Sequence, residues 1–302
     1  MEEQLKTIIE KYTLNTFQVA LISVIVSVFT FLITAYLKNY FENRLLQRKL
    51  ETEHKFDQQK QIKEVLAKNK VHLLTACEEL NHRMWNFANN YQKGWLNVNG
   101  DYKNEHYYFH SFAYRFLAVY AWIKKIQKEM IFLDTTIASN KDLEFIKFLK
   151  VFPQIFCDLT FIKGENADEN NNGDHFYRNT FELLPDCIID DTGIKSFSEY
   201  LNDTRHLQGR LRKLYLFLDG ISPGENRRRW DRLNLLNLTL IIFLNNYGYD
   251  FQQTNEIKME EAISQPKVSR HLKNYFSLFN EYCLGDNPEV TRLAKIAKKF
   301  YA

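Results

Sequence analysis

A run of 21 residues without charge, Pro or Gly lies near the start of the chain, from Phe17 to Leu37. At about 1.5 Å per residue, a helix of this length crosses the ~30 Å hydrocarbon core of a bilayer once. The leader 1–16 has mixed charge where a signal peptide has a basic region, and no small-residue cleavage motif follows the run. The pattern therefore predicts a retained transmembrane helix over 17–37.

The charges that flank this run predict its orientation. Lys6 and Lys11 precede it, and four cations follow it closely: Lys38, Arg44, Arg48 and Lys49. Lys and Arg near the ends of a span favour the cytoplasmic side. We therefore expect an extracytoplasmic leader and a cytoplasmic C-terminal part.

The rest of the chain has a helical pattern of apolar positions. Residues 38–62 contain no Pro or Gly and are rich in Lys, Glu, Gln and Leu, which predicts a helical stalk continuous with the span. Amphipathic periodicity then begins at Ile62 and continues through 63–302, and the whole chain has only 10 Gly and 5 Pro. We expect an all-α protein whose body is a multi-helix bundle. The Asn-rich stretch 164–174 predicts an exposed loop and a possible subdomain boundary.

Two later segments allow alternative interpretations. The apolar stretch 233–244 is too short for a second span and is flanked by Asn, so we expect a buried core helix. Residues 249–257 fit either a strand or a loop.

The polar positions inside the span fall on one stripe. Ser23, Ser27, Thr30 and Thr34 are spaced by four, three and four residues. Small and hydroxylated residues form contacts between transmembrane helices, which predicts self-association, and several copies could turn the stripe toward a water-filled pore. In the alternative, a monomeric anchor, the hydroxyls donate to carbonyls of their own helix.

The densest group of cations is Arg227, Arg228 and Arg229, with Arg232 one turn later. It coincides with the predicted start of a helix, where free backbone N–H groups and arginines together form phosphate sites. Arg212 and Lys213 belong to the preceding predicted helix, and a helical hairpin could bring them close. The pattern predicts a phosphate or nucleotide site on these six residues; the alternatives are a solvated face or salt bridges between subunits.

Other chemistry has little support. His106 and His110 share a helical face at i and i+4, but no third metal ligand is identifiable, and the motifs of P-loop, Rossmann and serine-hydrolase enzymes are absent. We expect no cofactor and no metal, and a membrane-anchored metal-dependent enzyme is the least favoured interpretation. Four scattered cysteines and a net charge of +3 indicate neither a zinc motif nor a general nucleic-acid binder.

The order of one amino-terminal span, a helical stalk and a Phe-, Tyr-, Asn- and Lys-rich helical body resembles the membrane effectors of bacterial anti-phage (abortive infection) systems. The layout is most similar to the effector of Hailong-type systems. The resemblance concerns architecture and contains no diagnostic motif. It implies a homo-oligomeric ion channel of the bacterial inner membrane, held closed by a nucleic-acid product of a partner nucleotidyltransferase.

These observations lead to one main hypothesis and an alternative. The main hypothesis is a homo-oligomeric effector in the lipid bilayer, such as a tetramer, with pore-lining Ser23, Ser27, Thr30 and Thr34. Its cytoplasmic body senses a nucleotide or oligonucleotide. The span contains no ring of charged residues, so we expect little charge selection. The alternative is a membrane-tethered helical scaffold without a pore.

Overall fold

The computed structural model describes residues 15–104, 106–162, 174–191, 193–225, 227–267 and 269–301. Regular structure in these residues is helical, apart from one isolated antiparallel bridge between Ile189 and Ile194. The predicted all-α fold is confirmed. Residues 164–173 of the predicted loop 164–174 and most of the leader 1–16 lie outside the described residues.

Helix α2 joins segments with three different sequence patterns. It runs from Thr16 to Asn90 and includes the apolar run, the polar stalk and the first amphipathic segment of the body. It is long and apolar enough to cross a membrane, and no residue of its most apolar 18-residue stretch is buried inside the protein. The chain divides into two compact units, Met1–Gln58 and Gln59–Ala302, so that α2 contributes to both. We refer to the second unit as the body.

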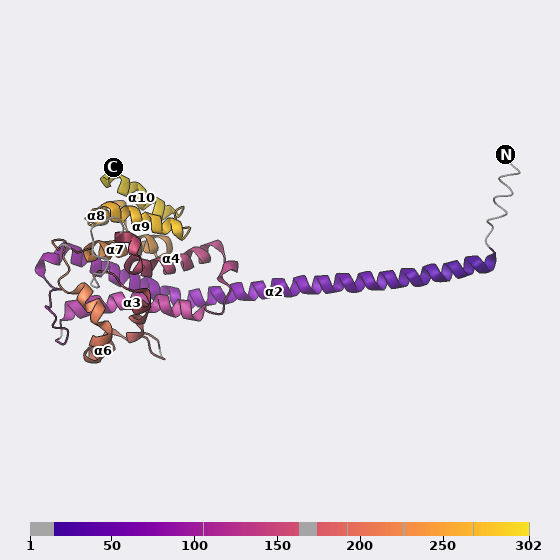
Figure 1. Ribbon diagram of the computed structural model, residues 1–302, viewed down its shortest axis with the longest axis horizontal. Coiled ribbons are helices and arrows are strands. Elements are labelled where there is room, and N and C mark those ends of the chain that lie inside the picture. Colours follow the sequence, from indigo (N-terminus) through magenta and orange to yellow (C-terminus); the bar gives the residue numbers. More distant parts are fainter. Residues whose placement is uncertain are drawn as a thin grey trace. The chain divides into compact units, whose positions relative to one another are not determined.

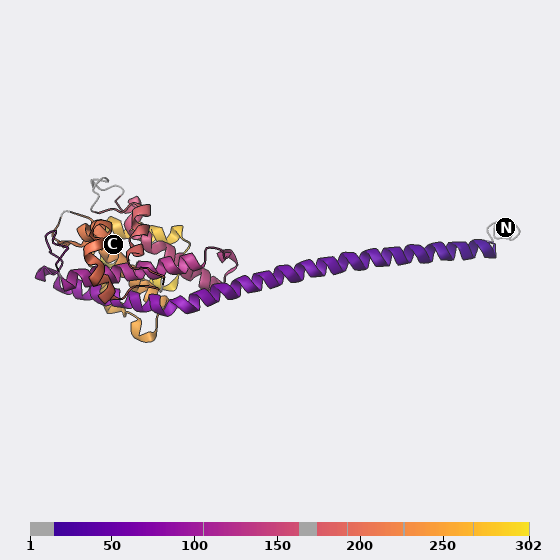
Figure 2. The same ribbon diagram turned by 90° about the horizontal axis from the view of Figure 1, so that it is seen from below.

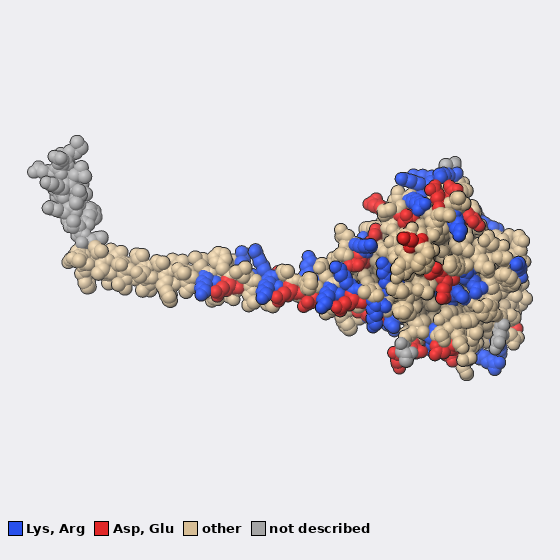
Figure 3. Space-filling model, turned by 180° about the vertical axis from the view of Figure 1, so that it is seen from behind, with Lys and Arg blue, Asp and Glu red and all other residues tan. Residues whose placement is uncertain are grey.

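The polar stretch of α2 carries its own ion pairs. Lys38 pairs with Glu42, and Lys49 pairs with Glu53, at nitrogen–oxygen distances of 3.9 and 3.8 Å. Figure 3 shows α2 first without charged side chains and then with blue and red ones alternating. Pairs at i and i+4 each stabilise an exposed helix by about 0.3–0.5 kcal/mol. They support the helix where few apolar contacts are available.

The body begins with an antiparallel helix pair. Its part of α2 packs along α3 (Tyr107–Glu129), and Figures 1 and 2 show the two side by side. Asn69 donates to Glu129 near one end, and Tyr108 donates to Asn86 near the other, both at 2.9 Å. Buried residues of α2 recur at helical spacing, from Ile62 to Phe87. The amphipathic pattern that begins at Ile62 therefore places this part of α2 in the core.

The other helices surround this pair. α3 packs against α6 (Phe197–Leu218), while α4 (Asn140–Cys157) packs against α7 (Arg229–Tyr247). Figure 1 shows α6 on one side of the body and three shorter helices on the opposite side. These are α8 (Glu256–Ile263), α9 (Ser269–Glu281) and α10 (Pro288–Tyr301). The remaining helical segments are α5 (Arg178–Leu183) and the 3-10 turns η1 (Tyr91–Lys93), η2 (Thr135–Ile137), η3 (Leu159–Ile162), η4 (Pro185–Cys187) and η5 (Asp250–Gln252).

Helix α7 is the central element of the core. Every residue from Arg229 to Leu244 is buried, which confirms the prediction of a core helix over 233–244. Two of its polar side chains bond within the helix: Asn234 donates to Trp230 O, and Thr239 donates to Leu235 O. Such bonds allow polar residues in a dry interior. The ambiguous segment 249–257 forms η5 and the start of α8.

A single carboxylate fixes the chain between α2 and α3. Asp219, at the end of α6, accepts hydrogen bonds from the backbone N–H groups of Val98, Asn99 and Gly100 and from the Tyr102 hydroxyl, at 2.7–3.1 Å. Asn99 and Gly100 have positive φ values of 51° and 81°. This segment is therefore a loop held in place by Asp219, and α3 begins after it, at Tyr107.

Candidate functional site

Three hydroxyl groups of the stripe donate hydrogen bonds within the helix. Ser27 donates to Ser23 O at 2.8 Å, and Thr34 donates to Thr30 O at 2.7 Å. Thr30 donates to Val26 O at 2.8 Å. This is the geometry of the monomeric-anchor alternative. It leaves oxygen lone pairs on the same face, which remain able to accept hydrogen bonds.

Arg229, predicted to bind phosphate, is buried and caps another helix. Its Nη1 donates to the carbonyl oxygens of Leu216, Phe217 and Asp219 at 2.7–3.0 Å, and its side chain pairs with Glu225 at 2.6–2.8 Å. The last carbonyls of a helix lack intrahelical donors, and the C-terminal end of the dipole favours a cation. Arg229 is 4% exposed, so it stabilises the end of α6 and is inaccessible to solvent ligands in this conformation.

Arg232 has a similar role at the end of α4. Its Nη1 donates to Ile155 O at 2.6 Å, and its Nη2 donates to Asp158 O at 3.3 Å. The residue is 1% exposed. Burial lowers the pKa of Arg232 to about 10, so the guanidinium stays charged at neutral pH. Two of the six predicted ligands therefore connect helix ends within the core.

The other four predicted ligands are distributed over different environments. Arg227 forms an ion pair with Asp174 at 2.8 Å, and the same carboxylate accepts the backbone N–H of Arg228. Arg212 is exposed on α6. Lys213 is half-buried over the rings of Phe176 and Tyr177, and burial lowers its pKa. A phosphate approaching from solvent would reach Arg212 and, in part, Arg227 and Lys213. The predicted site on these residues stays a prediction.

The two histidines face different partners. His106 Nε2 lies 3.3 Å from an Asp101 carboxylate oxygen, and His110 Nε2 lies 3.1 Å from Asn104 O. Burial lowers the pKa of His110. Within the described part of the chain, no group of three or more His, Cys, Asp or Glu side chains could hold a metal ion.

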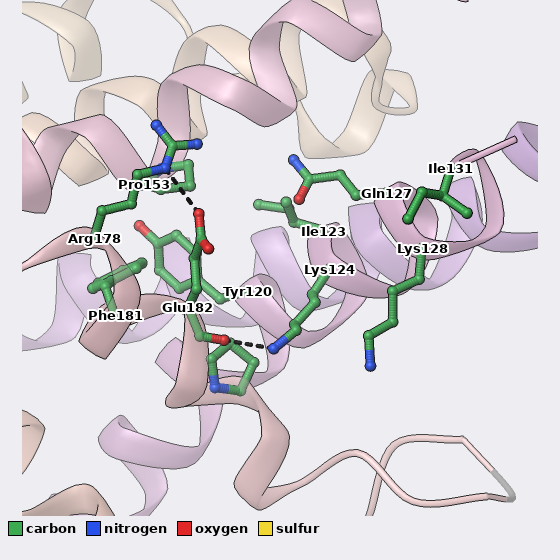
Figure 4. A pocket seen from close by; sticks show the side chains of 11 residues that line it. Tyr120, Ile123, Lys124, Gln127, Lys128, Ile131, Pro153, Arg178, Phe181 and Glu182 are labelled. Carbon is green, nitrogen blue, oxygen red and sulfur yellow. Dashed lines mark hydrogen bonds and ion pairs between the residues drawn. The ribbon is translucent and has the colours of Figure 1, made fainter. Parts of the chain in front are cut away.

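A cavity of about 240 Å³ lies between α3, α4, α5 and η4. Its wall includes apolar side chains from Tyr120, Ile123 and Phe181. Figure 4 shows two of the three cations that line it in polar contacts: Arg178 with the Glu182 carboxylate at 2.8 Å and Lys124 with Glu182 O at 2.6 Å. Lys124 also pairs with Asp186 at 2.7 Å. Lys128 is the third cation of the lining, so the cavity combines an apolar wall with a rim on which Lys124 and Arg178 are paired with carboxylates.

No protein-family model, curated protein or solved structure matches this chain. Functional inference therefore depends on the residues themselves. Sequence patterns identified the stripe and the arginines, but not a second cavity lined by Lys63, Lys70 and Lys141. Lys63 and Lys70 share a helical face at i and i+7, whereas the proximity of Lys141 depends on the fold.

Proposed function

We propose that this protein is an oligomeric single-pass membrane effector whose cytoplasmic body controls an ion-conducting path along α2. The observation that carries the proposal is the continuity of α2. One helix contains the apolar run and, beyond Gln59, the buried residues Ile62 to Phe87 of the body. A ligand that moves this part of α2 acts on the same helix that crosses the membrane, because consecutive helical turns are joined by backbone hydrogen bonds.

The flanks of the run support the proposed orientation. Lys38, Arg44, Arg48 and Lys49 all lie within 12 residues of Leu37, which favours a cytoplasmic position for the body. The proposed membrane is the inner membrane of a bacterium, as the resemblance to anti-phage effectors implies. The proposed ligand is a nucleotide or oligonucleotide made by a partner enzyme.

The stripe supports a path for small ions. Ser23, Ser27, Thr30 and Thr34 would present oxygen atoms to a central axis if several copies assembled around it. The hydroxyl groups of Ser27, Thr30 and Thr34 donate to helix carbonyls, so their oxygens could act as acceptors toward water and cations. Because residues 17–37 include no Asp, Glu, Lys or Arg, the path would discriminate little by charge.

Ion flux from liposomes containing the purified full chain tests the proposal. It should be measured with and without the small-molecule fraction of a cell extract. We expect flux in one of the two conditions, and we expect Ser23→Leu/Ser27→Leu/Thr30→Leu to abolish it. The control Ile25→Leu/Val28→Ile/Leu32→Ile changes the opposite face and should retain it. Absence of flux in both conditions, or equal flux from the stripe variant, would refute the proposal.

A membrane-tethered scaffold is the second candidate, and the internally bonded hydroxyls favour it. Ser27, Thr30 and Thr34 need no partner helix to satisfy their donors. This candidate predicts a monomer in detergent by analytical ultracentrifugation, and no flux. The effector proposal requires a discrete oligomer in the same measurement.

A further inference from the structure

Three lysines surround a cavity of about 190 Å³ in the body. Lys63 and Lys70 extend from α2, and Lys141 extends from the first turn of α4. Leu66, Phe145 and Tyr247 form part of the apolar wall. Phe145 is 3% exposed and Tyr247 is 7% exposed, so the rings form the base of the cavity and cannot stack on an entering ligand.

Lys70 is the least exposed of the three lysines that line this cavity. It is half-buried, and its Nζ lies 6.0 Å from the ring centroid of Phe145 and 5.7 Å from that of Tyr247. Burial and, next, the charge of Lys141 lower the pKa of Lys70, while Asp142 partly opposes them. A partly desolvated ammonium beside a like charge is unfavourable unless an anion compensates it.

The neighbouring carboxylates compensate these charges only in part. Asp142 lines the cavity, but its carboxylate also accepts the Ser139 hydroxyl. Glu144 accepts hydrogen bonds from Tyr247 and Asn287, and Glu64 pairs with Lys60. Among the described residues, Lys63, Lys70 and Lys141 form no ion pair with a carboxylate. The cavity therefore has three cations against one acid.

We propose that this cavity binds the phosphate or diphosphate group of a soluble small molecule, which bridges Lys63 and Lys70 of α2 to Lys141 of α4. The volume is below the roughly 300–1,000 Å³ of pockets that enclose a whole drug-sized ligand, so it suits a compact anionic group. A phosphate group carries about two negative charges or more, which suits a cavity lined by three lysines.

This site would give the proposed effector its ligand contact. An anion held between α2 and α4 would fix the segment of α2 that begins the body, and the effect on the span rests on the proposed function. Binding itself does not depend on a pore. A failure of binding and a failure of ion flux are therefore separate results.

Calorimetric titration of the full chain in detergent with inorganic pyrophosphate tests the site. We expect saturable binding and a melting temperature that rises with pyrophosphate concentration. Lys63→Gln/Lys141→Gln should bind about tenfold more weakly or worse, because two charge-assisted contacts are removed. The matched control Lys147→Gln/Lys150→Gln removes the same charge from α4 outside the cavity and should bind like the parent.

Lys70→Met gives a second readout that a purely structural lysine would not produce. Methionine keeps an apolar stem over the rings and removes the uncompensated charge. We expect loss of pyrophosphate binding together with an unchanged or higher melting temperature of the free protein. A lower melting temperature with unchanged affinity would show that Lys70 serves the fold and would overturn its assignment to the site.

Short-chain phosphatidic acid, added in the same detergent, distinguishes the source of the phosphate. Binding of pyrophosphate supports a soluble ligand. Binding of phosphatidic acid alone would assign the site to a lipid headgroup and overturn the proposal of a soluble ligand. No saturable binding of either probe, or equal affinities in the cavity variant and its control, would overturn the site.

Discussion

Arg229 allows a direct test between a role in the fold and a role in ligand binding. Arg229→Met removes all five donors of the guanidinium but keeps a long apolar side chain. The carbonyls of Leu216, Phe217 and Asp219 would lose a buried donor, and Glu225 would lose its cation. Leaving a buried ionic partner uncompensated typically costs about 3–5 kcal/mol.

The expected cost is large enough to measure by thermal unfolding. For a unit of about 240 residues, 1 kcal/mol changes the melting temperature by about 2–4 °C, so Arg229→Met should lower it by about 6–20 °C. Circular dichroism of the purified full chain in detergent would follow the loss of body helices. Arg212→Met, an exposed arginine on α6, is the matched control and should change stability by no more than about 0.5 kcal/mol.

A double-mutant cycle identifies the source of the loss. Glu225→Gln removes the charge that pairs with Arg229, so the double variant should cost less than the sum of the two single variants. The reasoning would be refuted if Arg229→Met melted within a degree or two of Arg212→Met. It would also be refuted if the two single effects were simply additive.

Two further predictions concern titrating groups. Burial raises the pKa of the Cys77 and Cys187 thiols, and it raises the pKa of Cys157 to about 12, whereas Cys283 is exposed. At pH 8, one thiol of the parent protein should therefore react rapidly with Ellman's reagent. No thiol should react rapidly in the Cys283→Ser variant. More than one rapid equivalent would contradict this. Burial, followed by the charges of Arg232 and Lys213, lowers the pKa of His175 from 6.5 to about 4. The folded state therefore binds fewer protons than the unfolded state in this window, and stability present above pH 6.5 should decline as the pH falls toward 4. Urea midpoints across this range should depend less on pH in His175→Gln, and an identical dependence would exclude His175 as the cause.

Helical content and the candidate span could be predicted because they depend on local patterns. The uncharged run 17–37 and the spacing of apolar residues that begins at Ile62 can each be recognised from neighbouring residues alone. Both patterns lie in α2. The core position of 233–244 could be predicted because the stretch is too short for a span and too apolar for a surface. The hydrogen bonds that fix residues 98–100 could not be predicted, because their acceptor, Asp219, lies more than 100 positions away.

The roles of the cations depended on tertiary structure for a similar reason. The triplet 227–229 indicates a charged surface when the sequence is considered alone, but Arg229 contacts carbonyls at the end of α6, and Arg232 contacts those at the end of α4. Lys141 follows Lys70 by 71 positions, and the residues around it form no sequence motif that indicates a ligand site. Only the packing of α2 against the start of α4 places these two charges around one cavity.

The Lys–Glu pairs of α2 have a consequence for how two copies could lie along each other. Lys38, Lys49 and Lys60 each pair four residues ahead, and they recur every 11 positions. Eleven residues make slightly more than three whole turns, so the pairs form an almost straight row along the helix. Ser23 and Thr34 are separated by the same interval. Neighbouring copies that used this side of the rod would run straight or with a slight right-handed coil, in contrast to the left-handed winding that a seven-residue repeat imposes.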